Sequence, residues 1–217
     1  PIFANIILAD EINRAPAKVQ SALLEAMQEK QITIANETFK LDKPFIVLAT
    51  QNPIEQDGTY PLPEAQQDRF LMKVKIEYPT KEEEKNILKL LTSTTNFDSI
   101  EIEEVLNKDK IEELKKLIKE IHIDEKLMDY ILDIIFKTRE SNQYISCGAS
   151  PRASIALVVS AKANAFLEGR DFVIPQDIKK VIFDVLRHRI ILTYEAEAEG
   201  KDVEDIITDI MEGVELP

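Results

Sequence analysis

The chain has 217 residues, of which 44% are hydrophobic and 31% charged, a composition typical of a globular protein with a sizeable core. Its formal net charge of −13 argues against a surface built broadly for nucleic-acid phosphates, so we do not expect nucleic acid as a partner. The single cysteine, Cys147, excludes an internal disulfide, and no apolar run approaches the roughly 20 residues that a membrane-spanning helix needs. With no signal-like segment at the start, these features predict a cytoplasmic protein.

The first apolar run, Ile6-Ile7-Leu8-Ala9, predicts a strand buried on both faces, as in a parallel sheet. Asp10 and Glu11 follow it directly. Acidic residues at the carboxyl end of such a strand lie where open α/β sheets bind ligands. Taken alone, the run is explained equally well as a strand that ends in acidic turn residues. Because a strand buried on both faces needs neighbours on both sides, we expect the chain to be part of a longer protein.

The next segments predict the rest of an α/β region. A helix is expected to begin near Pro16 and to carry an apolar stripe of Val19, Leu23, Ala26 and Met27. Residues 31–34 and 38–41 alternate as in a β-hairpin that turns at Asn36-Glu37. Residues 45–50 form a second continuous apolar run, so we expect a parallel α/β sheet.

Three further elements are expected before the chain changes character. Gly58, Pro61 and Pro63 predict an irregular loop over residues 55–68 that leads into a short helix. Residues 70–78 alternate as in a strand. A helix then opens at Pro79-Thr80, and its stripe should face the sheet through Ile87, Leu88 and Leu91.

We place a domain boundary at about Thr94, which divides the chain into residues 1–94 and 95–217. Beyond it the apolar spacing is helical throughout, so the predicted fold class is α/β plus all-α. In the helix that Ser150 caps, Ile155, Val158 and Val159 are expected to form the apolar stripe. Helical stripes are predicted at 111–121, 127–135, 150–169, 175–185 and 203–210.

The two strand ends carry the residues that suit phosphoryl transfer to water. That chemistry needs a metal-binding acid and a group that orients the attacking water, and Asp10 and Glu11 could divide these tasks because adjacent residues point in different directions. The amide of Asn52 could reach both a γ-phosphate and that water. For Asn52 alone, a turn before Pro53 is the simpler interpretation.

Two arginines lie at later element boundaries. Arg69, just before the predicted third strand, could act across a subunit boundary as an arginine finger, and an ordinary salt bridge with Asp68 or Glu64 is an equal alternative. Arg152 lies in the first turn of a helix, where a cation opposes the helix dipole, so its position favours contact with an anion.

In their order along nearly the whole chain, these segments resemble the MoxR family of AAA+ ATPases. The motifs that carry the resemblance are Asp10-Glu11-Ile12-Asn13-Arg14-Ala15, Ala49-Thr50-Gln51-Asn52-Pro53, Glu55-Gln56-Asp57-Gly58-Thr59-Tyr60-Pro61-Leu62-Pro63-Glu64-Ala65, Asp68-Arg69-Phe70 and Ser150-Pro151-Arg152-Ala153. The resemblance implies part of a parallel-sheet P-loop NTPase (AAA+) domain followed by a helical-bundle lid domain. The hairpin at 31–41 is similar to the pre-sensor-1 hairpin, which faces the central pore in related motors.

For the strand ends, the resemblance implies that Asp10 and Glu11 are the Walker B acids and that Asn52 is sensor 1. Asp10 would bind Mg²⁺ through water, and Glu11 would act on the attacking water. The bound cofactors would be ATP and Mg²⁺.

For the arginines, the resemblance implies that Arg69 is the arginine finger and Arg152 is sensor 2. Arg14 matches the family's residue that follows Walker B, which could contact a neighbouring subunit. The family forms homo-oligomeric rings, often hexameric, with a chaperone-like role in assembling or activating partner complexes. Its partners often contain von Willebrand factor A-type domains.

The chain departs from the family in one respect. It contains five glycines and no G-x-x-x-x-G-K-[ST] sequence, the phosphate-binding Walker A loop, which in the family would precede Pro1. We therefore expect this chain alone not to bind or hydrolyse ATP appreciably, and the full-length protein to do both.

Two other functions are compatible with the residues. If the chain is complete, a binding or regulatory module that never hydrolyses ATP would explain the missing loop. A metal-dependent nuclease could combine Asp10 and Glu11 with Asp57 or Asp68, but the acidic charge and the lack of basic stretches count against it.

Overall fold

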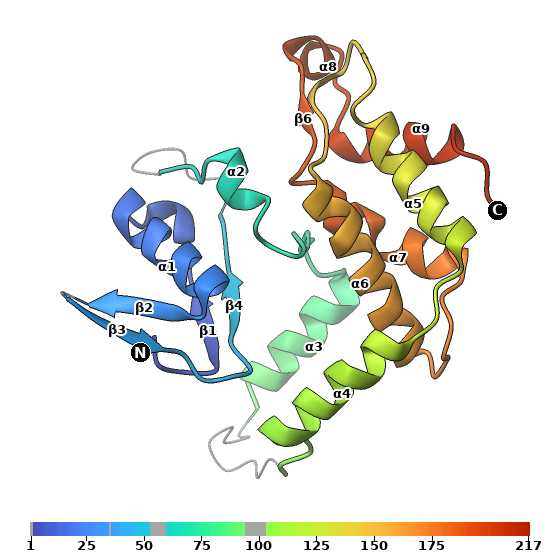
Figure 1. Ribbon diagram of the computed structural model, residues 1–217. Helices are drawn as coiled ribbons and strands as arrows, with labels where there is room; N and C mark the ends of the chain where they lie inside the picture. Colours follow the sequence, from blue (N-terminus) through green and yellow to red (C-terminus); the bar gives the residue numbers. More distant parts are fainter. Residues whose placement is uncertain (1, 35, 53–59, 94–102) are drawn as a thin grey trace.

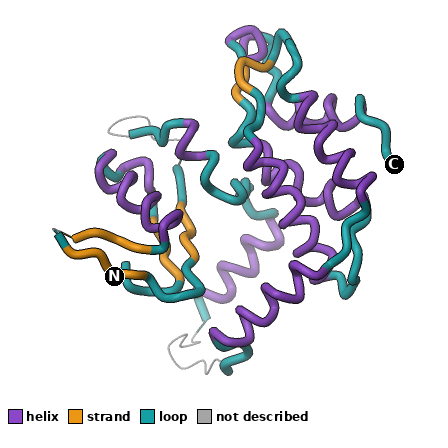
Figure 2. The backbone as a smooth tube through the Cα atoms, viewed as in Figure 1, coloured by secondary structure: helices purple, strands orange, loops and turns teal. Residues whose placement is uncertain are grey.

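The chain folds into an α/β part and a helical part that lie side by side (Figure 1). The computed structural model describes residues 2–34, 36–52, 60–93 and 103–217. Figure 2 shows β1 to β4 gathered in one part and helices dominating the other, which agrees with the predicted fold class. The boundary predicted near Thr94 lies outside the described residues and stays a prediction.

Two parallel strands form the centre of the α/β part. β1 (Ile6–Ala9) pairs with β4 (Ile46–Ala49), and Ala9 lies opposite Ala49. The two apolar runs therefore form the parallel strands that the sequence predicts.

A helix and a hairpin connect these strands. The short 3-10 helix η1 (Ile12–Arg14) leads to α1 (Ala17–Glu29), and β2 (Gln31–Ile34) pairs antiparallel with β3 (Glu37–Lys40). The predicted helix and hairpin are confirmed, although β3 begins at Glu37, one residue earlier than predicted.

The two faces of the β1–β4 sheet have different surroundings. Leu23 and Leu24 of α1 lie in one apolar cluster with Ala9, Val47 and Ala49 of the strands. Ile6 and Leu8 are 61% and 64% exposed. The prediction of a strand buried on both faces is therefore wrong for the described chain, because α1 covers only one face.

Residues 70–79 form no strand, which corrects the prediction for 70–78. The backbone N–H of Lys73 donates to the carbonyl of Asp184 in the helical part, at 2.8 Å. Met72 packs against the core of that part, while Val74 and Ile76 remain exposed. The alternation is present in the sequence, but this segment bonds to a helix end instead of a strand edge.

Two helices complete this part of the chain. The short helix α2 (Glu64–Gln67) follows the loop, as predicted. α3 (Lys81–Leu91) begins with a capping box in which the Glu83 carboxylate accepts from the Thr80 N–H and the Thr80 hydroxyl accepts from the Glu83 N–H. The predicted helix is confirmed, but its predicted packing on the sheet is wrong, because none of its residues is buried.

The helical part contains the predicted helices and one short strand pair. Its elements are α4 (Lys108–Glu120), α5 (Glu125–Lys137), β5 (Ile145–Cys147), α6 (Pro151–Leu167), α7 (Pro175–Leu186), β6 (Ile191–Leu192), α8 (Tyr194–Ala198) and α9 (Val203–Glu212). β5 pairs antiparallel with β6, an exception to the helical pattern predicted beyond Thr94. None of the helices in the described residues is long and apolar enough to cross a membrane.

A continuous apolar core holds these helices together. Ile134 of α5, Leu157 of α6, Ile182 of α7 and Ile207 of α9 are all fully buried. The apolar stripe predicted at 203–210 lies on α9 and packs against the core, as its helical spacing predicts.

The buried face of α6 differs from the predicted one. Ala153, Leu157 and Ala161 are fully buried, whereas Ile155 and Val159 are exposed and Val158 packs against the core only in part. α6 makes its most extensive contacts with α7. Small alanine side chains allow two helices to approach closely, so the large β-branched residues turn outward.

Candidate active site

The candidate active site begins where β1 and β4 end. Because these strands are parallel and in register, the residues that follow them are brought to one edge. Asp10 and Glu11 follow β1, and Thr50 and Asn52 follow β4. This edge is where open α/β sheets bind ligands.

The hydroxyl of Thr50 joins the two strand ends. It donates to the Oδ1 atom of Asp10 at 2.5 Å and accepts from the backbone N–H of Glu11 at 2.8 Å. The backbone of Thr50 continues the pairing, since its carbonyl accepts from the N–H of Ile12 at 3.0 Å. The Thr50 side chain therefore holds both acidic residues and fixes the turn of the backbone at Asp10-Glu11.

Glu11 has an unusual backbone conformation. Its φ of 48° lies in the left-handed region, which costs a residue other than glycine about 1–3 kcal/mol and is often found at functional positions. The turn brings Arg14 back toward it, and Arg14 Nε lies 3.2 Å from Glu11 Oε2. Both side chains are more than one third exposed, so this ion pair contributes at most about 1 kcal/mol.

Asn52 lies at the same edge as the acids. Its backbone carbonyl is 3.5 Å from Asn13 Nδ2, the upper limit for a hydrogen bond. Nearby, the buried Gln20 donates to the carbonyls of Ile12 and Tyr60, at 3.1 and 2.8 Å. Gln20 therefore ties α1 to the turn after β1 and to the chain that leads into α2.

Arg69 follows α2 and lies against α1. Its guanidinium donates to the Oε1 atom of Gln28, and the two side chains line a shallow cavity with residues of α1 and α2. The salt bridge with Asp68 or Glu64 that the sequence left open is not formed among the described residues. Asp68 instead pairs with arginines of the helical part.

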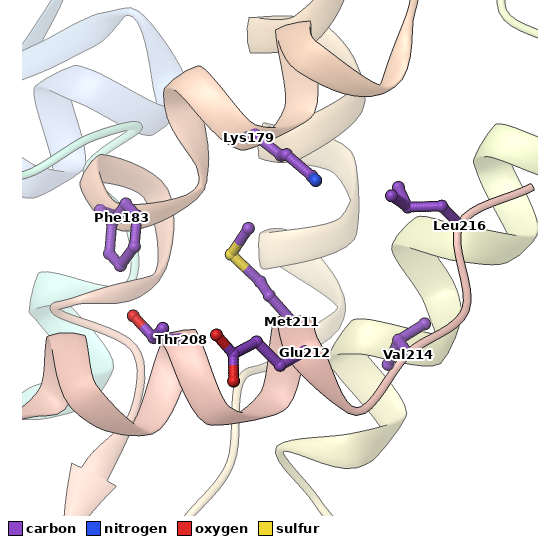
Figure 3. A pocket seen from close by; sticks show the side chains of 7 residues that line it. All are labelled: Lys179, Phe183, Thr208, Met211, Glu212, Val214 and Leu216. Carbon is purple, nitrogen blue, oxygen red and sulfur yellow. The ribbon is translucent and has the colours of Figure 1, made fainter.

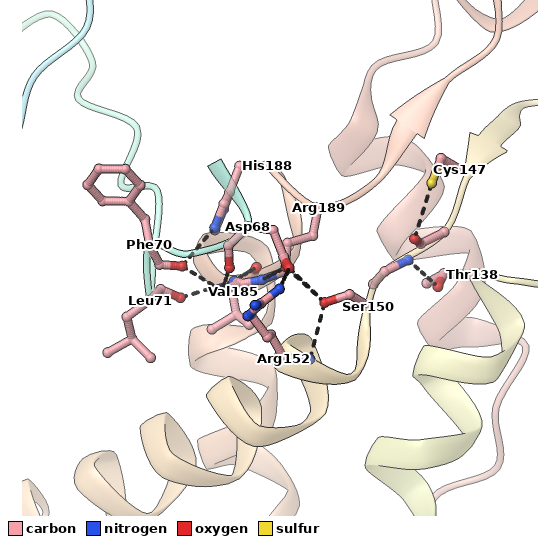
Figure 4. A network of polar contacts seen from close by, with 12 residues as sticks. Asp68, Phe70, Leu71, Thr138, Cys147, Ser150, Arg152, Val185, His188 and Arg189 are labelled. Carbon is pink, nitrogen blue, oxygen red and sulfur yellow. Dashed lines mark hydrogen bonds and ion pairs between the residues drawn. The ribbon is translucent and has the colours of Figure 1, made fainter. Parts of the chain in front are cut away.

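Asp68 is the acceptor of a network that joins the two parts of the molecule (Figure 4). Its Oδ1 atom accepts from Arg189 Nε at 3.0 Å, and its Oδ2 atom accepts from Arg152 Nη1 at 3.1 Å. The hydroxyl of Ser150 lies 3.0 and 2.8 Å from the two oxygens. One carboxylate therefore holds three side chains of the helical part.

The charges of this network are stabilised by their partners. Burial raises the pKa of Asp68, but hydrogen bonds from Ser150, Arg152 and Arg189 lower it more, so the net pKa lies below its usual value. Burial lowers the pKa of Arg189, and Asp68 offsets part of this effect. Because an arginine remains protonated in proteins, the pair is ionic at neutral pH.

The start of α6 places Arg152. The Ser150 hydroxyl accepts from the Arg152 N–H at 3.1 Å, which confirms the predicted N-cap. The residue before it is fixed as well, because the Ala149 N–H donates to the Thr138 hydroxyl at 3.0 Å. A Cβ atom on Gly148 would lie 2.2 Å from the Thr138 carbonyl oxygen, so this approach requires glycine.

The segment after Arg69 contacts residues beyond α7. The Nε2 atom of His188 donates to the Phe70 carbonyl at 3.2 Å, and Arg187 donates to the Lys73 carbonyl. Burial, followed by the charge of Arg189, lowers the pKa of His188 to about 4, so this histidine is neutral at pH 7. His188 thus has a packing role between the end of α7 and the segment after Arg69.

A metal ion would find only part of its ligand set here. Asp10 and Glu11 offer the carboxylate oxygens that Mg²⁺ prefers, but the described residues contain no group of three or more His, Cys, Asp or Glu able to hold a metal. Water and phosphate oxygens would have to complete the coordination. Asp68 is engaged with arginines instead, which argues against the nuclease alternative, and Asp57 lies outside the described residues.

A separate shallow pocket lies in the helical part, between α7, α9 and the C-terminal tail (Figure 3). Phe183, Met211 and Val214 give it an apolar lining, with Lys179 and Glu212 beside them. None of the residues assigned to the candidate active site lines this pocket.

The structure divides the predicted site residues between two places. Asp10, Glu11, Arg14 and Asn52 gather at the strand edge, as their positions predict. A second group lies at the junction with the helical part and consists of Asp68, Arg69 and Arg152. Asp68 binds Arg152, and Arg69 directly follows Asp68 in the chain.

Three polar residues of these regions were not singled out from the sequence. Thr50 could have been found from its place directly after an apolar strand, between Ala49 and Asn52. Arg189 follows the apolar stripe of α7 so closely that burial of its charge could have been suspected. The sequence gives no comparable signal for Gln20, which lies within an ordinary amphipathic helix.

Two family models match the chain. The one described as "ATPase family associated with various cellular activities (AAA)" matches residues 1–72, and the one described as "AAA lid domain" matches residues 137–210. These ranges correspond to the α/β part with α2 and to most of the helical part.

Known proteins are similar over the whole length of the chain. Chaperone MoxR1 of Mycobacterium tuberculosis is 45% identical, and the chain covers 59% of it. The uncharacterized protein YeaC of Bacillus subtilis is also 45% identical, and the chain covers 67% of it. The crystal structure of a putative ATPase from Cytophaga hutchinsonii has a TM-score of 0.92 and 49% identity, and the chain covers 68% of that structure.

These matches agree with the architecture and with the motif order. An AAA match covers the strand edge, and a lid match covers both Arg152 in α6 and Arg189 just after α7. The chain belongs to the MoxR family of AAA+ ATPases.

Proposed function

We propose that the complete protein containing this chain hydrolyses ATP with Mg²⁺ at the boundary between subunits of a ring. The observation that carries the proposal is the strand edge, where the Thr50 hydroxyl bonds both to the Asp10 carboxylate and to the Glu11 backbone. This arrangement holds two consecutive acidic residues where a parallel sheet presents residues to a ligand. Family membership supports ATP as that ligand.

Asp10 and Glu11 would divide the work at this edge. The Asp10 carboxylate can accept more than the one bond from Thr50, so it would hold Mg²⁺ through water. Bound there, Mg²⁺ would neutralise charge on the phosphate oxygens. Glu11, with its backbone held in the left-handed region, would use its carboxylate to orient the attacking water. Asn52, at the end of the adjacent strand, would contact the same water and the γ-phosphate.

The arginines would supply positive charge from other directions. Arg69, which is exposed beside α1, would serve as the arginine finger for the nucleotide of a neighbouring subunit. Arg152 is 55% exposed at the start of α6 and would contact the γ-phosphate as sensor 2. Arg14, whose ion pair with Glu11 lies at the surface, would contact the neighbouring subunit.

We propose a chaperone-like role for the assembled protein. The name of the relative Chaperone MoxR1 supports this role. A homo-hexameric ring and partners with von Willebrand factor A-type domains are the corresponding proposals for assembly and clients. We also propose that the 217-residue chain alone binds ATP poorly, because its sequence has no Walker A motif.

The direct test is ATP turnover by the complete protein with Glu11→Gln. The amide keeps the size of the side chain but cannot act as a base, so turnover should fall by about 10²–10⁴-fold while ATP binding persists. Glu112→Gln is the matched control, because Glu112 lies on the surface of α4 beside Lys115 and should leave turnover unchanged.

Unreduced turnover with Glu11→Gln would remove Glu11 from its proposed role. A complete wild-type protein that binds ATP but does not hydrolyse it would favour the non-hydrolysing regulatory module instead.

A further inference from the structure

The consecutive residues Arg187, His188 and Arg189 all bond to one segment of the chain. This segment, residues 68–73, carries Arg69 and crosses from α2 to the helical part. Arg187 donates to the Lys73 carbonyl, His188 to the Phe70 carbonyl, and Arg189 to the carbonyls of Asp68, Phe70 and Leu71. The end of α7 therefore holds the backbone of the 68–73 segment, partly visible in Figure 4.

Arg189 makes most of these bonds and is itself buried. Its side chain is 2% exposed, and it also donates to the carboxylate of Asp68 and to the carbonyl of Val185. A guanidinium has five donors in a rigid plane, which suits several acceptors at once, whereas a lysine ammonium is a single point of charge. The site thus uses the planar set of five donors that only an arginine side chain has.

Arg69 lies between two residues that Arg189 holds. The carbonyls of Asp68 and Phe70 both accept from Arg189 Nη2, while the Arg69 side chain reaches Gln28 on α1. Met72 adds an apolar anchor, because it packs against the core of the helical part. The backbone position of Arg69 is therefore set by the helical part, and its side-chain direction by the α/β part.

Asp68 connects this segment to a second candidate residue. Its carboxylate binds Arg189 through Oδ1 and Arg152 through Oδ2. A ligand that draws Arg152 away from Asp68 would break one of the contacts that hold Asp68 in place. Because Asp68 directly precedes Arg69, the position of Arg69 would then be less constrained.

We propose that Arg189 is a positioning residue for Arg69 and that Asp68 links the position of Arg69 to the state of Arg152. This inference rests on the proposed function, because it assumes that Arg69 acts on ATP. It adds a path by which the nucleotide held near Arg152 in one subunit influences the finger that this subunit presents to its neighbour.

The first experiment measures backbone protection by hydrogen–deuterium exchange in the complete protein. Arg189→Lys keeps the charge but loses the planar donors, so amide exchange in the 68–73 segment should become at least about tenfold faster, above all at Lys73, whose N–H bonds to Asp184. Arg170→Lys is the matched control. It alters another ion pair of the helical part, with the buried Asp177, and should leave exchange in this segment unchanged.

The second experiment measures steady-state ATP hydrolysis well below the unfolding temperature. Arg189→Lys should lower kcat by about tenfold or more and change KM for ATP by less than about twofold, whereas Arg170→Lys should change neither. Asp68→Asn is the second variant should Arg189→Lys not fold, and it should also speed exchange in the segment and lower kcat.

The third experiment tests whether the defect lies in the neighbour's site. An Arg189→Lys subunit keeps Glu11, and a Glu11→Gln subunit keeps a well-placed Arg69. Mixed rings of the two should therefore hydrolyse ATP faster than the sum of the separate variants. Arg69→Ala mixed with Glu11→Gln should recover turnover in the same way.

The outcomes separate this inference from the proposed function. If Arg69→Ala is rescued by Glu11→Gln but Arg189→Lys is not, the positioning role is wrong and the arginine finger stands. If no mixture is rescued, or the wild type does not hydrolyse ATP, the proposed function fails. In either case, amide exchange in the 68–73 segment tests whether Arg189 fixes the backbone of this segment. Unchanged exchange in both Arg189→Lys and Asp68→Asn would overturn the positioning role of Arg189.

Discussion

The helical part and the α/β part bury their apolar side chains differently. The helical part has one continuous core, in which Ile134, Leu157 and Ile182 are fully buried. The α/β part has two smaller clusters around α1 and the hairpin, and Leu8 and Leu48 remain more than half exposed on one sheet face. Most of the packing energy of this chain is therefore in its helical part.

The candidate chemistry is distributed in the opposite way. Asp10, Glu11 and Asn52 lie in the lightly packed α/β part, on strand ends held by a few hydrogen bonds such as those of Thr50. The 68–73 segment connects this part to the helical core. The comparison indicates that changes at the strand edge and at Arg69 should lower activity with little loss of stability. Changes in the helical core should instead lower the stability of the fold.

The largest expected effect is on activity, at Arg69. Arg69→Ala in the complete protein should lower ATP turnover by about 10³-fold, because an arginine finger stabilises charge in the transition state. The thermal unfolding midpoint should stay nearly constant, since the side chain is exposed and its bond to Gln28 lies at the surface. Turnover and calorimetry on the same samples check this. A protein that instead loses stability and ATP binding would assign Arg69 a structural role.

The next effect is on stability and uses a matched pair of leucines. Leu157→Ala removes a fully buried side chain from the helical core, so the free energy of unfolding should fall by about 2–5 kcal/mol. Leu8→Ala changes a side chain that is 64% exposed and should cost less than about 1 kcal/mol. Urea unfolding of the 217-residue chain measures both. Equal losses would contradict the contrast in packing.

A third effect depends on pH at the junction between the two parts. His188 has a pKa of about 4 in the folded chain, against about 6.5 when unfolded, so the unfolded chain binds more protons between these values. The contribution of His188 to the free energy of unfolding is therefore fully present above pH 6.5. It should be lost, by up to about 3 kcal/mol, as the pH falls toward 4. Denaturant titrations at a series of pH values measure it.

His188→Gln is the control for that pH dependence, because it removes the titrating group and should flatten the curve between pH 6.5 and 4. Asp68 titrates in a separate window. Its pKa is lowered in the folded chain, so its contribution is present above its unfolded pKa and is lost only at lower pH. An unchanged slope in His188→Gln would contradict the buried neutral state of this histidine.

The smallest effect is local, at the start of α3. Thr80→Ala removes the hydroxyl of the capping box and should destabilise this helix by about 1 kcal/mol. Because α3 buries none of its residues, the loss should appear as faster amide exchange in residues 81–91 of the 217-residue chain, without a change in its unfolding midpoint. Ser150→Ala, at the cap of the well-packed α6, is the contrasting variant and should lower the midpoint. Equal shifts in both variants would argue against a loosely packed α3.

Sequence reasoning succeeded where a local pattern decides the structure. The apolar runs at 6–9 and 46–49 form strands, and Ser150 with Pro151 starts α6, because each depends on neighbouring residues alone. The candidate site residues at the strand edge were found for the same reason, since the end of a parallel strand fixes where the following side chains lie.

Predictions failed where a distant partner decides the structure. Residues 70–78 alternate like a strand, but their backbone bonds to the end of α7, more than 100 positions away, as in the pair of Leu71 and Arg189. Burial of strand faces and of α3 also depends on what packs against them, which spacing does not reveal. In α6 the core face was assigned to Ile155, Val158 and Val159, of which only Val158 packs against the core, because hydrophobicity was weighed without the close approach that alanines allow.

The central claim is that the strand edge of Asp10 and Glu11 carries the hydrolytic chemistry. The most direct measurement is the identity of the nucleotide that the complete Glu11→Gln protein retains after incubation with Mg²⁺ and ATP, determined by chromatography of the released nucleotide. We predict that it retains ATP, while the wild type retains ADP. Recovery of ADP from Glu11→Gln, formed at the wild-type rate, would contradict the claim.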